Sequence, residues 1–187
     1  MKFKILFLAL ILISVKTFSQ SKNTISVEYG VTANTVDIHG AKGDFGYNDG
    51  SGYEAGLNYF YNLSHSFALG TGLVYSENKI QLTTIYLGYN GVYNQTVAMI
   101  TVPLYAKYSF FKFLYAQGGI TADHQINYSR DSYIVDQSGI GIELGLGGRY
   151  SFGPGSVFVN PFFCRHGINA SRNLIDAGVR FGIGYSF

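Results

Sequence analysis

The sequence contains little of what most soluble domains rely on. It has no tryptophan, one cysteine and three prolines in 187 residues, and charged residues make up 13% of the chain, against about 25% in ordinary soluble domains. The single Cys164 excludes an internal disulfide and has no second thiol for a metal site. The four histidines show no metal-ligand spacing, so the sequence predicts neither a metal nor a cofactor.

An excess of basic charge is also missing once the first residues are set apart. The chain has 13 Lys and Arg against 11 Asp and Glu, but Lys2, Lys4 and Lys16 all belong to the N-terminal segment. The remainder has ten bases against eleven acids, a net charge of −1. No basic stripe is left that would indicate a nucleic-acid partner.

The N-terminal segment has the layout of a secretory signal peptide. A positive start precedes a short apolar run from Ile5 to Val15, and small or polar residues follow. We expect residues 1–19 to be the signal peptide, which leaves Gln20 as the first residue of a single domain over 20–187. The alternative, an uncleaved anchor, is disfavoured because a helix that spans a bilayer needs about 20 apolar residues.

Helical spacing and long apolar runs are absent after residue 20. Large apolar residues instead alternate with glycine or polar residues, a period of two that predicts β-strands. Each predicted strand fits the roughly 9–11 residues of a tilted strand that crosses a membrane. We expect eight strands, at about Thr24–Thr32, Gly52–Leu63, from Phe67, Met99–Phe110, Phe113–Asp123, Gly139–Phe152, Ser156–Arg165 and Leu174–Phe187.

Short and long connections alternate between these strands. The stretches "LSHS", "SFFK" and "FGPGS" are tight, whereas the others are longer and polar. This pattern is typical of an all-β, eight-stranded antiparallel up-and-down transmembrane barrel with short periplasmic turns and longer extracellular loops.

The connection between the third and fourth strands contains a strong hairpin signal of its own. Asn90-Gly91 is the two-residue sequence that most favours a tight hairpin turn. With the turn there, Tyr75 faces Ala106, and the apolar faces of both strands agree. We therefore predict a long hairpin that stands above the membrane.

The residues on the second face of each strand decide which face meets lipid. In a soluble barrel such as a lipocalin, the apolar face points inward and the other face should be rich in Lys, Glu and Thr. Here the second face is rich in glycine, which packs nothing on a wet surface but fits the narrow interior of an eight-stranded barrel. The apolar face is therefore expected to contact outer-membrane lipid. These glycines are Gly30, Gly56, Gly70, Gly72, Gly119, Gly141, Gly145, Gly147, Gly178, Gly182 and Gly184.

Charged residues on the same face predict a charge network in the lumen. Four acids and three bases can pair there, which offsets the cost of removing them from water. The predicted members are Glu28, Glu54, Lys107, Glu143, Arg149, Asp176 and Arg180.

Aromatic residues gather at the predicted short-turn end, as in the interfacial girdle of a membrane barrel. They are Tyr61, Phe67, Tyr108, Phe110, Phe111, Phe113, Tyr150, Phe152, Tyr185 and Phe187.

Two kinds of residue fit the barrel pattern less simply. Pro103 and Pro161 fall inside strands, where we expect bulges or irregular pairing. The rings of Phe60, Phe158 and Phe162 should point into the lumen and fill space beside glycines.

The chain resembles a known family over its whole mature length. The stretch "ITVPLYAKYSF" over 100–110 and the terminal "GYSF" are similar to the eight-stranded outer-membrane barrel domain widespread in Bacteroidota, often called PorT-like. More distantly, the chain resembles the OmpX and OmpA barrels. The resemblance implies that the final Phe187 is the signal by which barrel-assembly machinery recognises the chain.

We expect a structural or interaction function and not an enzymatic one, carried out by the extracellular loops and the hairpin over 77–97. The hairpin could recruit an extracellular or envelope protein by strand addition. One alternative is a lipid-modifying enzyme, because His166 and Asn169 match part of the His-x-Ser-Asn stretch of lipid A deacylase. Ile168 occupies the nucleophile position there and Ser171 is displaced, which disfavours this alternative. The other alternative is a small pore gated by the lumen charges.

Overall fold

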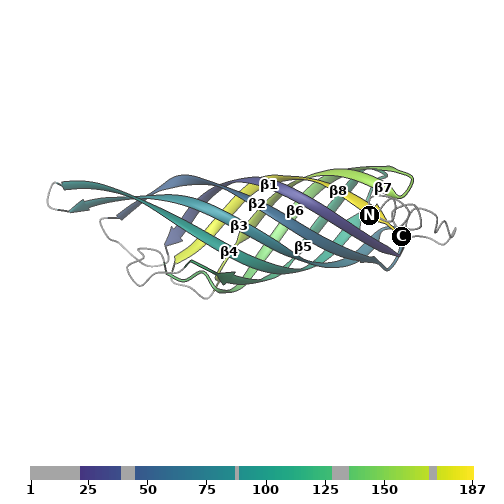
Figure 1. The fold of residues 1–187 in the computed structure, drawn as a ribbon, viewed down its shortest axis with the longest axis horizontal. Coiled ribbons are helices and arrows are strands. Elements are labelled where there is room, and N and C mark those ends of the chain that lie inside the picture. The colour runs from purple at the N-terminus through teal and green to yellow at the C-terminus, as the bar shows by residue number, and fades with distance from the viewer. Residues whose placement is uncertain (1–21, 39–44, 87–88, 128–134, 169–171) are drawn as a thin grey trace, which may run out of the picture.

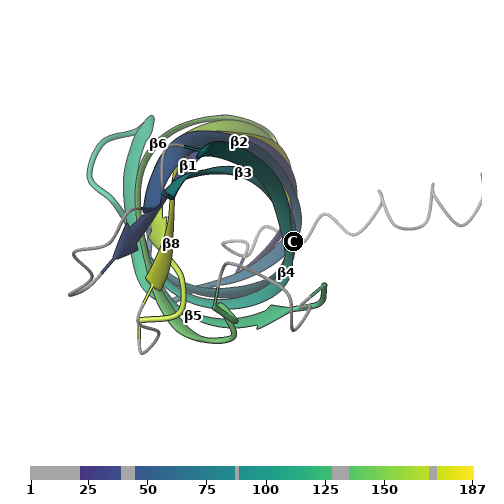
Figure 2. The same cartoon turned by 90° about the vertical axis from the view of Figure 1, so that its left-hand side faces the viewer.

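The structure is a computed structural model that describes residues 22–38, 45–86, 89–127, 135–168 and 172–187. Eight strands close into one antiparallel barrel in chain order, with β1 paired to β8. Figure 1 shows the barrel from the side, and Figure 2 looks along it, where the strands form a ring. The strands are β1 Asn23–Ile38, β2 Phe45–Asn62, β3 Phe67–Tyr86, β4 Tyr89–Ser109, β5 Leu114–Gln125, β6 Gly139–Phe152, β7 Gly155–Arg165 and β8 Arg172–Ser186.

The three tight connections lie at one end of the barrel, together with the C terminus (Figure 1). Phe67 N donates a hydrogen bond to the Ser64 side chain in the first of these turns, and Gly153 takes a φ of 60° in the last. The other connections lie at the opposite end, which we call the loop end. Among the described residues, no helix has the length and apolar character needed to cross a membrane.

Most strands run further toward the loop end than predicted. β1 reaches Ile38 and β2 begins at Phe45, so much of the loop expected over 33–51 is strand. Continued pairing explains the difference, because Val36 faces Leu174 on β8 and the backbone groups of this stretch find partners there.

The two faces of the wall differ in exposure as predicted. On β1 and β2, Val27 and Leu57 are each 55% exposed, while the adjacent Glu28 and Asn58 are 6% and 2% exposed. The large apolar side chains therefore point outward and the polar ones inward, opposite to a lipocalin-like barrel. All ten residues of the predicted aromatic girdle are exposed on the outer wall or in the turns of the short-turn end.

The hairpin turn predicted at Asn90-Gly91 is wrong. Asn90 pairs with Ile85 and Gly91 with Thr84, so both lie inside β4. The last pair of the hairpin is Tyr86 with Tyr89, which places the turn at 87–88, outside the described residues.

The register of β3 on β4 differs accordingly by six residues. Tyr75 faces Ile100, and Ala106 faces Leu69. In the predicted register, Phe67 would lie opposite Leu114, which is beyond the end of β4 and belongs to β5. The tight turns on both sides thus fix the register, and because six is even, every side chain keeps its predicted face.

Both prolines interrupt one ladder without shifting it. The β3–β4 pairing skips Pro103 and its neighbour Val102, and the β6–β7 pairing skips Pro161 and Asn160, while the register before and after each gap is the same. Irregular pairing is therefore confirmed at both prolines, but neither produces a bulge. A register shift occurs instead in the β2–β3 ladder, between Asn48 and Ser51.

The β3–β4 register can be checked by disulfide formation in a Cys164→Ser background. Directly opposed residues have Cβ atoms about 4.5–5.5 Å apart, so we expect Tyr75→Cys with Ile100→Cys to cross-link. Tyr75→Cys with Ala106→Cys is the matched control, since six residues along a strand place the thiols about 20 Å apart. Thiol alkylation followed by gel mobility measures both variants, and cross-linking of the control pair would contradict the register.

Candidate functional site: the barrel interior

Aromatic rings fill the space that the inward glycines leave. A Cβ atom built on Gly70 would collide with the Phe60 ring, and one on Gly182 with the Phe158 ring. The same relation joins Gly178 to Phe162, whose ring lies 3.0 Å from the built atom. The prediction that these three rings point into the lumen beside glycines is confirmed. Glycine is required at such positions because a ring from a neighbouring strand occupies the place of its side chain.

Arg180 on β8 holds three carboxylates at the middle of the barrel. Its guanidinium donates to Glu54 of β2 and Glu143 of β6, with Nη2 at 3.2 Å and 2.9 Å from one oxygen of each. Glu28 of β1 has Oε1 3.7 Å from Nε. All four side chains are nearly fully buried. We call these four residues the Arg180 cluster.

Two aromatic residues complete the surroundings of the Arg180 cluster. The Tyr105 hydroxyl donates to Glu143 at 3.0 Å, and the Phe162 ring centre lies 3.7 Å from Cζ of Arg180. Buried charges of this kind are stable only when they are paired and hydrogen-bonded. The cluster joins four strands across the lumen, β1, β2, β6 and β8, and Tyr105 adds a fifth, β4.

The remaining two predicted bases lie apart from these carboxylates, in the half of the barrel near the short turns. Lys107 places its ammonium 3.7 Å from the Phe60 ring centre and 4.5 Å from that of Tyr115. Within the described ranges, neither Lys107 nor Arg149 forms an ion pair. Both face inward and are only partly buried. Aromatic faces therefore contact the Lys107 charge where a carboxylate was expected.

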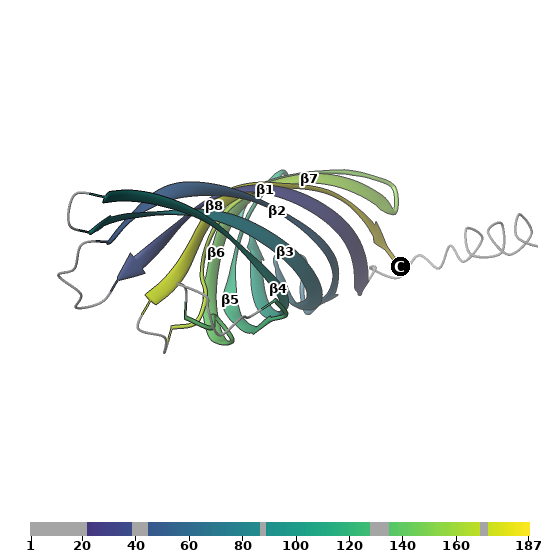
Figure 3. The same cartoon turned by 60° about the vertical axis from the view of Figure 1, so that its left-hand side comes forward.

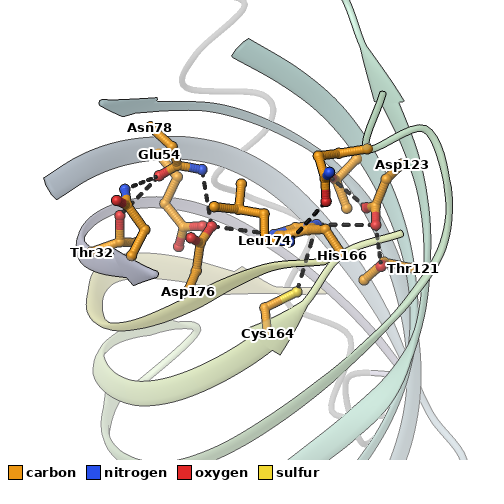
Figure 4. Close-up of polar contacts among 12 residues, drawn as sticks. Thr32, Glu54, Asn78, Thr121, Asp123, Cys164, His166, Leu174 and Asp176 are labelled. Carbon is orange, nitrogen blue, oxygen red and sulfur yellow. Dashed lines mark hydrogen bonds and ion pairs between the residues drawn. The ribbon is translucent and has the colours of Figure 1, made fainter. Parts of the chain in front are cut away.

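The last predicted member, Asp176, belongs to a second network closer to the loop end (Figure 4). His166 lies between two carboxylates, with Nδ1 3.0 Å from Asp123 and Nε2 3.2 Å from Asp176. Asn78 donates to Asp176 at 3.0 Å, and Thr101 donates to Asp123 at 2.9 Å. Figure 4 shows these side chains converging across the lumen from opposite walls.

An apolar cluster closes the lumen above this network. Its members point inward and are 7% exposed or less. Nearer the short-turn end, by contrast, the large apolar residues of the strands point outward. Toward the loop end, the inward-facing residues of these strands are therefore apolar. This apolar cap consists of Val36, Ile80, Val97, Met99 and Leu174.

Little open space remains between these layers. The cavity beside the Arg180 cluster, lined also by Ser76, Thr101 and Cys164, has about 10 Å³ for the centre of a water molecule, which is room for about one water. Ser76 Oγ has no protein partner in the structure, so a water there would satisfy it.

All seven predicted charged residues thus face the lumen, but they do not form one network. Four make up the Arg180 cluster, Asp176 contacts His166, and Lys107 and Arg149 lie apart from both. Sequence reasoning missed Asp123, His166, Tyr105 and Tyr115, which lie on the same inward phase as residues that it identified. Asp123 and His166 were missed because they fall at the ends of the predicted strands. Phe187 pairs with Asn23 through both backbone groups and is exposed; its recognition by the barrel-assembly machinery and cleavage after Ser19 stay predictions.

The enzyme alternative requires His166 to act in an active site at the rim of the barrel. His166 directly follows β7, but its side chain is buried in the lumen. It continues the inward row of β7 and is 5% exposed, with both ring nitrogens engaged by carboxylates. Asn169 and Ser171, which would have to act with it, lie outside the described residues. Across the described ranges, no group of three His, Cys, Asp or Glu side chains is arranged to hold a metal ion.

Comparisons with known proteins agree with this architecture. A family model described as "Outer membrane protein beta-barrel domain" matches residues 18–187. The sequence matches no curated protein.

Several solved structures share the fold at low identity. OprG from Pseudomonas aeruginosa is 13% identical with a TM-score of 0.54, and covers 90% of this chain and 97% of its own. The N-terminal β-barrel domain of OprF from Pseudomonas aeruginosa is 16% identical with a TM-score of 0.51, covering 90% and 100%. Ail from Yersinia pestis, solved with the heparin analogue sucrose octasulfate, is 13% identical with a TM-score of 0.52, covering 89% and 99%.

Removing the Arg180 charge should destabilise the barrel. Arg180→Met leaves three buried carboxylates without their cation, and we expect a loss of about 3–5 kcal/mol in the free energy of unfolding. Urea unfolding in detergent micelles, followed by circular dichroism, measures this loss. Arg149→Met is the matched control and should cost less than about 1 kcal/mol, and adding Glu54→Gln and Glu143→Gln to Arg180→Met should restore part of the stability. Equal effects of the two arginine variants would contradict the assignment.

Proposed function

The chain belongs to the outer membrane protein β-barrel domain family, and on this basis we propose that it is a non-enzymatic barrel with a plugged lumen that contacts a partner protein at its loop end. The family places the protein in the outer membrane, so its exposed apolar wall meets lipid. In such barrels the short turns face the periplasm, which makes the loop end extracellular.

The observation that carries the plug is the Arg180 cluster at the middle of the lumen. It supports a closed interior because it joins four strands and leaves a cavity of about 10 Å³ beside it. The apolar cap supports the same conclusion on the extracellular side, since ions do not cross a dry apolar layer without losing their hydration.

Planar bilayer recordings test the plug. We expect no discrete conductance from the wild-type barrel at neutral pH, because an ion would have to displace buried paired charges and the apolar cap. Arg180→Ala, which removes the central side chain, is the variant most able to open a path. Stable conductance steps from the wild type would instead support the small gated pore, in which Lys107 or Arg149 exchanges partners with Arg180.

The partner contact is supported by a sheet that extends past the rest of the barrel. Figure 1 and Figure 3 show the β3–β4 hairpin reaching further than the other strands at the loop end. β5 pairs with β4 only up to Met99, and the Asn127 side chain then covers the edge by bonding Ala98 N and Thr96 O at 2.9 Å and 2.8 Å.

Beyond Gln95, β4 is an edge strand among the described residues. Its stretch 89–94 has no strand partner there except β3, whereas β3 itself is paired on its other side with 45–48 of β2. An edge strand presents unpaired N–H and C=O groups to which an extended segment of another protein can add. We therefore assign the β4 edge over 89–94 as the contact for a protein partner.

Site-specific photocross-linking in intact cells tests this edge. A photoreactive residue at position 91 on the edge should give a discrete protein adduct, detected by gel shift and mass spectrometry. The matched control is position 83, which faces strands on both sides through Gly46 and Val92. Replacing residues 82–93 by Asn-Gly should abolish binding of the partner so identified while leaving the barrel folded; adducts at both positions, or none, would contradict the assignment.

A further inference from the structure

Gly148 lies on the outer wall, where a glycine has no evident use. It follows Leu144 and Leu146 and precedes Tyr150 in the outward row of β6. Neighbours in that row are at least 60% exposed to the surrounding lipid. Glycine weakens a strand and contributes no contact to lipid, so a lipid-facing position should hold a larger apolar residue.

The chain itself does not require glycine at this position. A Cβ built on Gly148 would lie 3.7 Å from Phe113 O and 3.8 Å from Val159 Cγ1, which are ordinary contact distances. Gly118, the outward glycine on β5, is different, because Leu144 Cδ2 would lie only 2.8 Å from its Cβ. Gly139 is also open, but its φ of 147° explains the glycine. Among the glycines of β5, β6, β7 and β8, Gly148 alone has neither a steric nor a conformational reason.

A shallow apolar groove surrounds Gly148 on the outer wall. It is open to the outside, has a volume of about 830 Å³ and extends over five neighbouring strands. The ladder runs from Leu114 to Gly148, Val159, Phe181 and Tyr29. A glycine within a strand often marks a place where another molecule approaches the backbone closely, and here Gly148 lies on the floor of the groove.

Position and charge identify the molecule that fits this groove. Gly148 is four residues before the end of β6 at the short-turn end, hence in the periplasmic leaflet. The stacked rings of Phe113 and Tyr150, 6.2 Å apart, form the periplasmic side of the groove. The exposed Lys112 lies in the adjacent turn with Nζ 5.5 Å from the Phe113 ring centre.

We propose that this groove binds one acyl chain of an anionic phospholipid of the periplasmic leaflet, whose phosphate contacts Lys112. Inside a bilayer the hydrophobic effect does not favour one apolar surface over another, so affinity comes from close packing against the floor at Gly148. The lysine adds the preference for an anionic headgroup, because a cation at the membrane surface attracts anionic lipid.

Native mass spectrometry of the barrel released from bilayers of phosphatidylglycerol and phosphatidylethanolamine tests the proposal. The wild type should retain one phosphatidylglycerol. Gly148→Leu places a side chain on the floor of the groove, where its Cβ meets no clash. We expect about tenfold weaker retention, since about ten close carbon contacts are lost. Ala122→Leu adds one carbon fewer, at an outward position away from the groove, and should retain lipid as the wild type does.

The charge is tested in the same measurement. Lys112→Glu should lose the preference for phosphatidylglycerol over phosphatidylethanolamine, whereas Lys22→Glu, a second exposed lysine at the same end, should keep it. Heat-dependent gel mobility verifies that each variant is folded. Unchanged lipid retention in Gly148→Leu would overturn the proposal, and so would a wild-type dimer that Gly148→Leu dissociates, because a second copy would then occupy the groove.

Discussion

Closure of the sheet is the constraint on which the rest of this structure depends. A membrane offers no hydrogen-bonding partner to a strand edge, so β1 must pair with β8 along its whole length. Eight strands enclose a narrow interior, and each inward position must then suit the few atoms that fit there. The glycines beside Phe60, Phe158 and Phe162 follow from that shortage of space. So does the concentration of charge at Arg180, since a buried guanidinium needs carboxylates from several strands to balance it.

Alternation with a period of two made the wall predictable from the sequence. It determined the orientation of Val27 and Glu28 and the bounds of β6, because lipid on one side and a crowded lumen on the other impose opposite demands on successive residues. Charge pairing was less predictable. Which acid meets which base depends on strand tilt and register around the closed ring, and Asp176 consequently contacts His166 while Glu54 contacts Arg180.

Local turn preference misled the prediction at Asn90-Gly91, where tertiary pairing overrides it. The tight turns next to Phe67 and Ser109 fix the lower ends of β3 and β4, and the hairpin can close only where the two strands run out together. The apolar cap was not predicted, for a related reason. Val36, Ile80 and Met99 obey the same alternation, but in the opposite phase, because outward residues at that height, such as Lys79 and Gln81, are polar and exposed. A reversal of phase within one strand is the sequence signal that marks this boundary.

The even register difference in the β3–β4 hairpin has an evolutionary consequence. Inserting two residues into each strand above Met99 lengthens the projecting sheet and leaves the facing of every side chain below it unchanged. Inserting a single residue would instead move every side chain of the distal strand to the opposite face of the sheet. The height of the extracellular sheet can therefore change in paired steps under selection by whatever it meets, while the membrane-embedded ring stays as it is.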